Sequence, residues 1–127
     1  MTFKGRAFDL INTARGGRGL APLQYSTVLE SIAQDADFPG CDGIAVKGRC
    51  VDMGTRNYFS HSIQNCGNKG VTHMLVAAGV THSGAAENIA FMNGTDDEIV
   101  AADNIHNQFM SEPENQPNHK GNLLGPT

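Results

Sequence analysis

Apolar residues along the chain recur mainly every three or four positions, the spacing that places side chains on one face of a helix. Between positions 7 and 15, for example, Phe8, Ile11 and Ala14 share one face. The chain is therefore predicted to be dominated by helices, at 7–15, about 26–36, one or two turns within 51–59, 71–78 and 95–110.

Capping residues mark where two of these helices begin. Ser26 or Thr27 can accept a hydrogen bond from the first turn of the second helix. Thr95 and Glu98 match a capping box, with Thr95 as the cap of the last long helix. Pro113 follows that helix and is predicted to end it.

Two segments depart from the helical spacing. Residues 86–92 have partial strand character and run into Asn93-Gly94, a strong turn signal. Residues 114–127 are polar and contain several prolines and glycines, which predicts an irregular tail. We therefore expect a mixed α+β fold with a remnant strand near 87–92.

Size and charge narrow the function classes. The chain has 127 residues, 39% of them hydrophobic, and this predicts one soluble domain over 1–127. A net charge of −4 argues against nucleic acid or an anionic membrane surface as a partner. The longest strongly apolar stretch, 74–78, is too short to span a bilayer, and the N-terminus lacks the apolar run of a signal peptide.

Three cysteines make an odd count. Cys41 and Cys50 bracket a glycine-rich segment, which favours a Cys41–Cys50 disulfide with Cys66 unpaired. The alternative is three reduced thiols in a cytosolic protein. No Cys-x-x-Cys motif is present, which excludes a zinc knuckle built on such thiolates.

The motifs of several enzyme classes are missing from the sequence. It has no glycine-rich turn between a strand and a helix, no phosphate-binding loop and no Gly-x-Ser-x-Gly elbow. The histidines at 73, 82 and 106 are interpreted as surface or core-edge residues. Four residues stand out instead: His61 and His119 in polar turns, Glu87 inside an apolar run, and Glu112 at a helix end. A carboxylate in an apolar run needs a cation, a hydrogen-bond donor or a metal.

The order of short motifs resembles the CAP superfamily (cysteine-rich secretory proteins, antigen 5 and pathogenesis-related class 1 proteins), in particular its bacterial SCP-domain branch. The resemblance covers nearly the whole chain. It rests on Ile11-Asn12-x-x-Arg15, Gly19-Leu20-x-Pro22-Leu23, Asp52-Met53-x-x-Arg56-Asn57-Tyr58-Phe59-Ser60-His61, Ala86-Glu87-Asn88-Ile89-Ala90, Phe109-Met110-Ser111-Glu112-Pro113 and Asn118-His119-Lys120-Gly121-Asn122-Leu123-Leu124.

This resemblance implies an α-β-α sandwich whose cleft holds two histidines and two glutamates, with zinc or another divalent metal bound there in some members. His61 matches the first histidine of the family and Glu87 the glutamate of its Glu-Asn-Ile segment. Glu112 resembles the second glutamate and His119 the last histidine.

The chain departs from the family pattern in two places. The stretch between Cys41 and Cys50 looks like an insertion. The family also continues past Leu-Leu-Gly with two strands that are missing here, so we expect a C-terminally truncated, helix-dominated form of the sandwich. The missing strands would leave an unpaired sheet edge, and such an edge can pair with a second copy of the chain to form a homodimer.

The resemblance implies a secreted or cell-envelope protein that binds a divalent metal or a small ligand in this cleft. The sequence does not distinguish a small molecule, a lipid or a protein as that ligand. The alternatives are a zinc-dependent hydrolase of peptide or ester bonds and a purely structural or interaction module.

For the site itself, we expect His61 and His119 to meet at one ion or ordered water. Glu87 would be a third ligand or would orient a histidine. Glu112 would hydrogen-bond to a ligand without binding the ion itself, or would act as an acid–base group. A polar cleft without metal is the alternative.

Overall fold

The computed structural model describes residues 1–125 and divides into two compact units. Unit 1 combines Met1–Gln24 with the chain from Ala90 onward, and unit 2 is the continuous segment Tyr25–Ile89. Six helices are present, and none of them is long and apolar enough to cross a membrane within the described residues. The assignment of both units to one domain stays a prediction.

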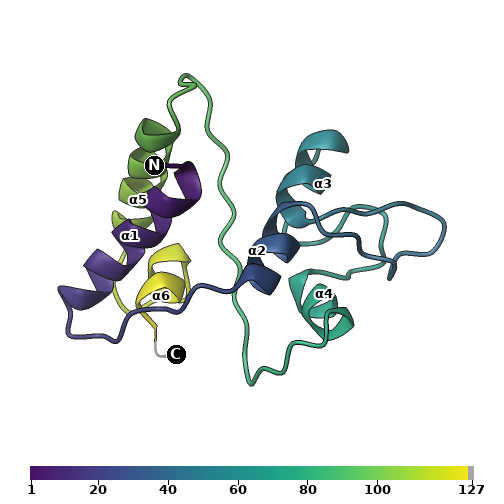
Figure 1. Cartoon of the computed structure of the whole chain (residues 1–127), viewed down its shortest axis with the longest axis horizontal. Coiled ribbons are helices and arrows are strands. Elements are labelled where there is room, and N and C mark those ends of the chain that lie inside the picture. The colour runs from purple at the N-terminus through teal and green to yellow at the C-terminus, as the bar shows by residue number, and fades with distance from the viewer. Residues whose placement is uncertain (126–127) are drawn as a thin grey trace. The chain divides into compact units, whose positions relative to one another are not determined.

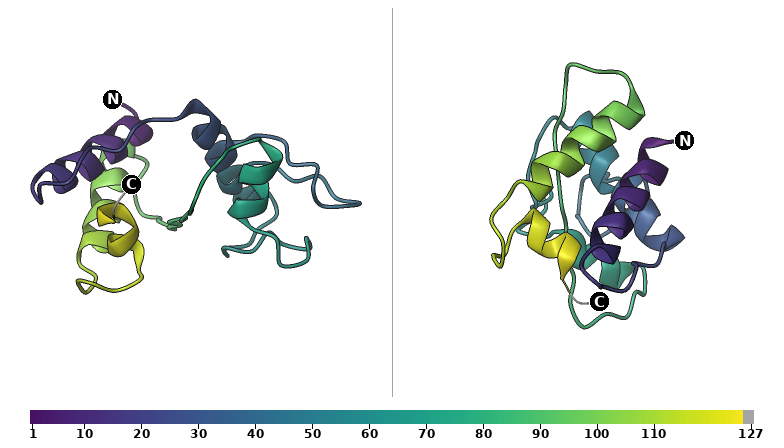
Figure 2. Two further views of the ribbon diagram at one scale, coloured as in Figure 1. Left: turned by 90° about the horizontal axis from the view of Figure 1, so that it is seen from below. Right: turned by 90° about the vertical axis from the view of Figure 1, so that its left-hand side faces the viewer.

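Unit 1 is built on two long helices from opposite ends of the sequence. Helix α1 (Phe3–Gly16) packs against α5 (Glu98–Met110), and the two lie side by side in Figures 1 and 2. The predicted cap of α5 is wrong by two residues, because the Asp97 side chain accepts the first-turn N–H groups and Thr95 instead accepts from the N–H of Asp97. An ionised carboxylate is the stronger acceptor at the positive end of a helix.

The predicted irregular tail contains a sixth helix, α6 (His119–Leu124), which contacts α1 and α5. Asn118 caps it by accepting from the N–H of Gly121 at 2.8 Å. Arg15, 1% exposed, donates to the carbonyls of Leu123 at 2.9 Å and Gly125 at 2.7 Å. A buried guanidinium far away in sequence therefore satisfies the carbonyls at the end of this short helix.

Unit 2 carries three short helices, α2 (Thr27–Gln34), α3 (Arg49–Thr55) and α4 (Val71–Ala77). Ser26 is the cap of α2, since its hydroxyl accepts from the N–H of Leu29, which confirms one of the two predicted caps. Helix α2 contacts both α3 and α4. Helices α2 and α4 contribute buried side chains to the apolar core of this unit, whereas the buried side chains of α3 are Arg49 and Asp52.

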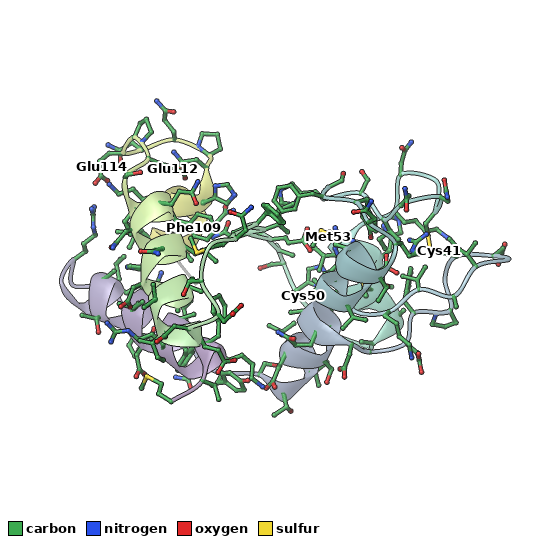
Figure 3. The ribbon with its side chains drawn as sticks, turned by 90° about the horizontal axis from the view of Figure 1, so that it is seen from above. Cys41, Cys50, Met53, Phe109, Glu112 and Glu114 are labelled. Carbon is green, nitrogen blue, oxygen red and sulfur yellow. A yellow bond between two sulfur atoms is a disulfide. The ribbon has the colours of Figure 1, made fainter. Side chains whose placement is uncertain are left out.

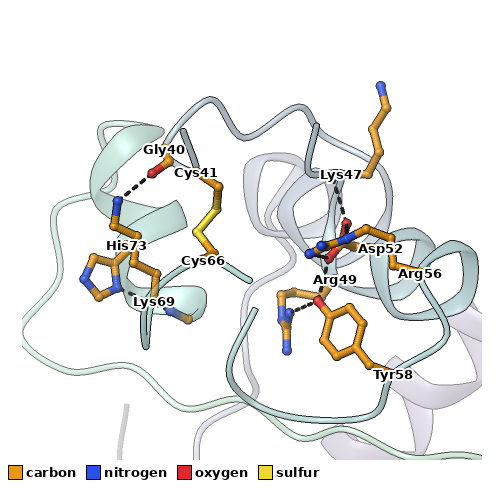
Figure 4. The surroundings of a disulfide bond; sticks show 11 residues. Gly40, Cys41, Lys47, Arg49, Asp52, Arg56, Tyr58, Cys66, Lys69 and His73 are labelled. Atoms are coloured by element: carbon orange, nitrogen blue, oxygen red, sulfur yellow. Dashed lines mark hydrogen bonds and ion pairs between the residues drawn. A yellow bond between two sulfur atoms is a disulfide. The ribbon is translucent and has the colours of Figure 1, made fainter. Parts of the chain in front are cut away.

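The core of unit 2 includes a disulfide between Cys41 and Cys66, which lie 25 residues apart (Figure 4). The predicted Cys41–Cys50 pair is therefore wrong, and Cys50 is an exposed free thiol. Both bonded cysteines are buried, because they belong to one core with apolar side chains from the whole unit. The spacing of the cysteines along the sequence does not predict that Cys41 and Cys66 lie close together. The other buried members are Ile32, Phe38, Val46, Ile63, Met74 and Leu75.

The remnant strand predicted near 87–92 is not formed, and residues 1–125 contain no strand. Without a partner to complete a hydrogen-bonded ladder, this segment runs as irregular chain. The one antiparallel bridge in the described part of the chain joins Phe38 and Val46. The helix-dominated architecture is confirmed, and the sandwich stays a prediction.

Candidate functional site

In unit 2, His61 and Glu87 form a pair. The Nδ1 atom of His61 lies 2.8 Å from Oε1 of Glu87. The imidazole is 59% exposed whereas the carboxylate is 12% exposed, so a nearly buried anion holds an accessible ring. A carboxylate accepts hydrogen bonds, which places the ring proton on Nδ1 and the lone pair on Nε2.

Arg49 holds the other oxygen of Glu87. Its side chain is 3% exposed, and its Nε donates to Oε2 of Glu87 at 2.9 Å. The same guanidinium donates to the Tyr58 hydroxyl at 2.9 Å and to the carbonyl of Ser60. Burial is the largest single effect and acts to lower the pKa of Arg49, but the hydrogen bonds and charge interactions with Glu87 and Tyr58 together outweigh it, so the pKa is raised. The prediction that Glu87 requires a cation or donor is confirmed, and both oxygens of Glu87 are used by protein groups.

A second carboxylate, that of Asp52, is connected to Arg49 through the Tyr58 hydroxyl (Figure 4). Asp52, 1% exposed, accepts two bonds from Arg56 at 2.9 Å each and one from the Tyr58 hydroxyl at 2.5 Å. Burial acts to raise the pKa of Asp52, but these bonds outweigh it and lower the pKa. Tyr58 has a raised pKa, because it is partly buried and donates to Asp52. The hydroxyl of Tyr58 thus joins both ion pairs and fixes the segment that leads to His61.

Unit 1 contains a matching pair, His119 and Glu112. Nδ1 of His119 lies 2.7 Å from Oε2 of Glu112, whose Oε1 accepts from the N–H of Lys120 at 3.0 Å. These two bonds, first that of His119, lower the pKa of Glu112 and keep it ionised. The ring of His119 also stacks on Phe109, with centroids 4.4 Å apart and planes 10° from parallel. Figure 3 shows Phe109 and Glu112 at the same end of α5.

The four candidate residues therefore occur as two histidine–glutamate pairs, one in each unit. In both pairs the carboxylate bonds to Nδ1, the arrangement by which proteins orient a histidine whose Nε2 binds a metal. The second oxygen of each glutamate accepts a hydrogen bond from a protein group, from Arg49 for Glu87 and from the Lys120 N–H for Glu112. No cluster of three or more potential metal ligands occurs within residues 1–125, and the four-residue metal site stays a prediction.

The other histidines have local roles that agree with their interpretation as surface or core-edge residues. His73 accepts from the N–H of Gly70 at the start of α4, and His82 bonds to the carbonyl of Val80. His106 is half-buried on α5, and burial lowers its pKa. Of these three, His82 is an exposed histidine in the same unit as His61.

Sequence reasoning missed Arg49 and the network that it organises. Asp52 and Arg56 stand four residues apart, a spacing that favours ion pairs on helices, and this signal was readable. Arg49 gives no comparable signal, because Glu87 lies 38 residues further along the chain. Only the need of Glu87 for a cation pointed to such a partner.

Comparison with known proteins gives one sequence match to report. The chain is similar to the uncharacterized protein YkwD of Bacillus subtilis (strain 168), with 27% identity over 124 residues, or 98% of this chain. The chain spans 38% of the length of that relative. No family model matches the chain. No solved structure matches it either.

Proposed function

We propose that this chain is a CAP/SCP-type domain of the cell exterior or envelope that binds a divalent metal, zinc above all, through His61 and His119. The observation that carries the proposal is the pairing of each histidine with a glutamate on Nδ1, at 2.8 Å and 2.7 Å. Two histidines from different parts of the chain share one chemical arrangement, and histidines that bind a metal usually have such a partner.

The donor types suit zinc. Zinc in proteins binds neutral imidazole and accepts carboxylate and water as further ligands, commonly with four ligands in all. An imidazole whose Nδ1 carries the proton binds a metal ion through Nε2. Glu87 and Glu112 then act by orienting the rings and raising their basicity, as the sequence interpretation allowed for Glu87.

A further observation supports the assignment to an exported protein. The disulfide between Cys41 and Cys66 agrees with an oxidising compartment, since cytosolic proteins rarely keep disulfides.

Zinc titration of the 127-residue chain by isothermal calorimetry tests the proposal. We expect binding to the parent chain and a loss with either His61→Ala or His119→Ala. Glu87→Gln should weaken binding about 10–100-fold, because the carboxylate no longer orients the ring. His82→Ala is the matched control, since it removes an exposed histidine of unit 2 outside the pairs.

The stoichiometry of the titration gives the number of zinc ions bound per chain, and each histidine variant should reduce zinc binding. Equal zinc affinity for the parent, both histidine variants and the control would overturn the metal function.

A further inference from the structure

A pocket of about 460 Å³ lies within unit 1, and neither proposed histidine ligand is among its lining residues. It is lined by the segment that follows α1, the loop between α5 and α6, and α6 itself. Three charged side chains share it, namely Arg18, Glu114 and Lys120. The volume is within the range of about 300–1,000 Å³ typical of small-molecule sites.

Arg18 and Lys120 both form ion pairs with the carboxylate of Glu114. Arg18 uses both terminal nitrogens, with Nη1 at 3.0 Å from Oε2 of Glu114 and Nη2 at 2.7 Å from Oε1. The Nζ atom of Lys120 lies 2.7 Å from the same Oε1. Two positive charges meet one negative charge, so the group has an excess of one positive charge and a fork geometry that suits a carboxylate.

Glu114 is held loosely enough to be exchanged. Its side chain is 49% exposed and that of Arg18 is 42% exposed, and exposed ion pairs contribute little to stability. Glu114 follows Pro113 in the loop between α5 and α6, where Figure 3 shows it close to Glu112. The bonds from Arg18 and then Lys120 lower the pKa of Glu114 to about 2, so it remains an anion at ordinary pH.

The remaining lining suits an apolar body that carries amide groups. Leu20, Pro113 and Leu124 supply apolar surface next to the two cations. Asn115 and Gln116 line the same pocket and offer side-chain amides that can donate and accept. A free peptide end presents these three chemistries together: a carboxylate, short apolar side chains and peptide groups.

We propose that this pocket binds the C-terminal carboxylate of a short peptide, which Arg18 and Lys120 hold in the place that Glu114 occupies in the unliganded chain. Glu114 is then a built-in competitor that keeps the two cations ordered and sets the affinity. This function is separate from metal binding by the histidine–glutamate pairs, and neither depends on the other.

The probe is N-acetyl-alanyl-alanine, titrated into the ¹⁵N-labelled 127-residue chain and followed by NMR chemical shifts of residues around the pocket. We expect the free acid to bind and its C-terminal amide to fail. Glu114→Gln should bind the acid more tightly, by about tenfold if the competitor occupies the cations nine-tenths of the time. Arg18→Gln and Lys120→Gln should each abolish the shifts.

The control is Arg6→Gln, which removes an arginine of unit 1 with a similarly exposed ion pair, to Asp103 at 2.7 Å, outside the pocket. It should bind as the parent does, and circular dichroism verifies the helices of every variant. Equal binding of acid and amide, or no gain with Glu114→Gln, would overturn the proposal. If acetate displaces the peptide at equal affinity, the pocket recognises a bare carboxylate and the assignment to a peptide is wrong.

Discussion

Replacement of Arg49 by methionine should destabilise unit 2 more than a typical surface change. Arg49 is 3% exposed and its partner Glu87 is 12% exposed, so the variant leaves a nearly buried carboxylate without its cation. It also removes the donors to the Tyr58 hydroxyl and the carbonyl of Ser60. Methionine fills a comparable length, so the loss is chiefly electrostatic.

The magnitude follows from the burial of the pair. Removal of one partner from a buried ion pair costs about 3–5 kcal/mol, and the residual exposure of Glu87 places Arg49→Met near the lower value, about 3 kcal/mol. In the double variant Arg49→Met/Glu87→Gln no charge is stranded. We therefore expect the double variant to recover about 1–2 kcal/mol relative to the sum of the single changes.

Intrinsic tyrosine fluorescence measures this unit alone. The chain has two tyrosines and no tryptophan, and both tyrosines, Tyr25 and Tyr58, belong to unit 2. A urea titration should show a lower midpoint for Arg49→Met at an unchanged slope. Because Arg49 touches Tyr58, the midpoint is verified by circular dichroism.

Lys47→Met is the matched control, since Lys47 is a half-exposed cation of the same unit paired with an exposed carboxylate. Its effect should be much smaller than that of Arg49→Met. Equal midpoint shifts for the two variants, or strict additivity in the double variant, would refute the reasoning.

Three further changes test other parts of unit 2. Cys41→Ala/Cys66→Ala opens a loop of 25 residues and should cost about 3–4 kcal/mol in urea unfolding, whereas peptide mapping that finds both thiols free in the parent would contradict the bond. Gly48→Ala places a Cβ 2.4 Å from backbone at the end of α2 and should destabilise by about 1–3 kcal/mol, whereas Gly54→Ala meets nothing within 4 Å and should be neutral or stabilising in the same assay. Asp52 has a lowered pKa, because hydrogen bonds outweigh burial, so its stabilisation is present above its ordinary value of 3.8 and is lost as pH falls; Asp52→Asn should weaken this acid dependence in thermal melts.

Local signals predicted much of the secondary structure. The cap at Ser26 and the helix 71–78 depend on contacts within a few residues, so the sequence contains the information. Helix α6 was missed because its six residues carry no apolar repeat. The carbonyl of Leu123 at the end of α6 accepts a hydrogen bond from Arg15, which lies 108 positions earlier in the sequence.

The candidate site also combines features that the sequence predicts with features that depend on contacts between distant residues. Glu87 could be singled out as a carboxylate in an apolar run, and His61 as a histidine in a polar turn. The sequence did not predict that Arg49 would hold the Glu87 carboxylate. The disulfide was mispredicted for a related reason. Cys41 and Cys50 are near in sequence, yet the apolar core of unit 2 gathers Cys41 with Cys66. Spacing ranks partners by loop length, whereas packing decides which pair meets.

The two-part composition of unit 1 imposes an order on how the chain can be assembled. Helix α1 leaves the ribosome before its packing partner α5, which begins at Glu98. Unit 2 is continuous from Tyr25 to Ile89, so it can be completed while α1 still waits. Until α5 is synthesised, the half-buried apolar side chains of α1, such as Phe8 and Ile11, have no surface within their own unit to pack against. Closure across so long a separation is slow compared with local folding, so α1 should be the segment of a nascent chain most in need of protection by a chaperone.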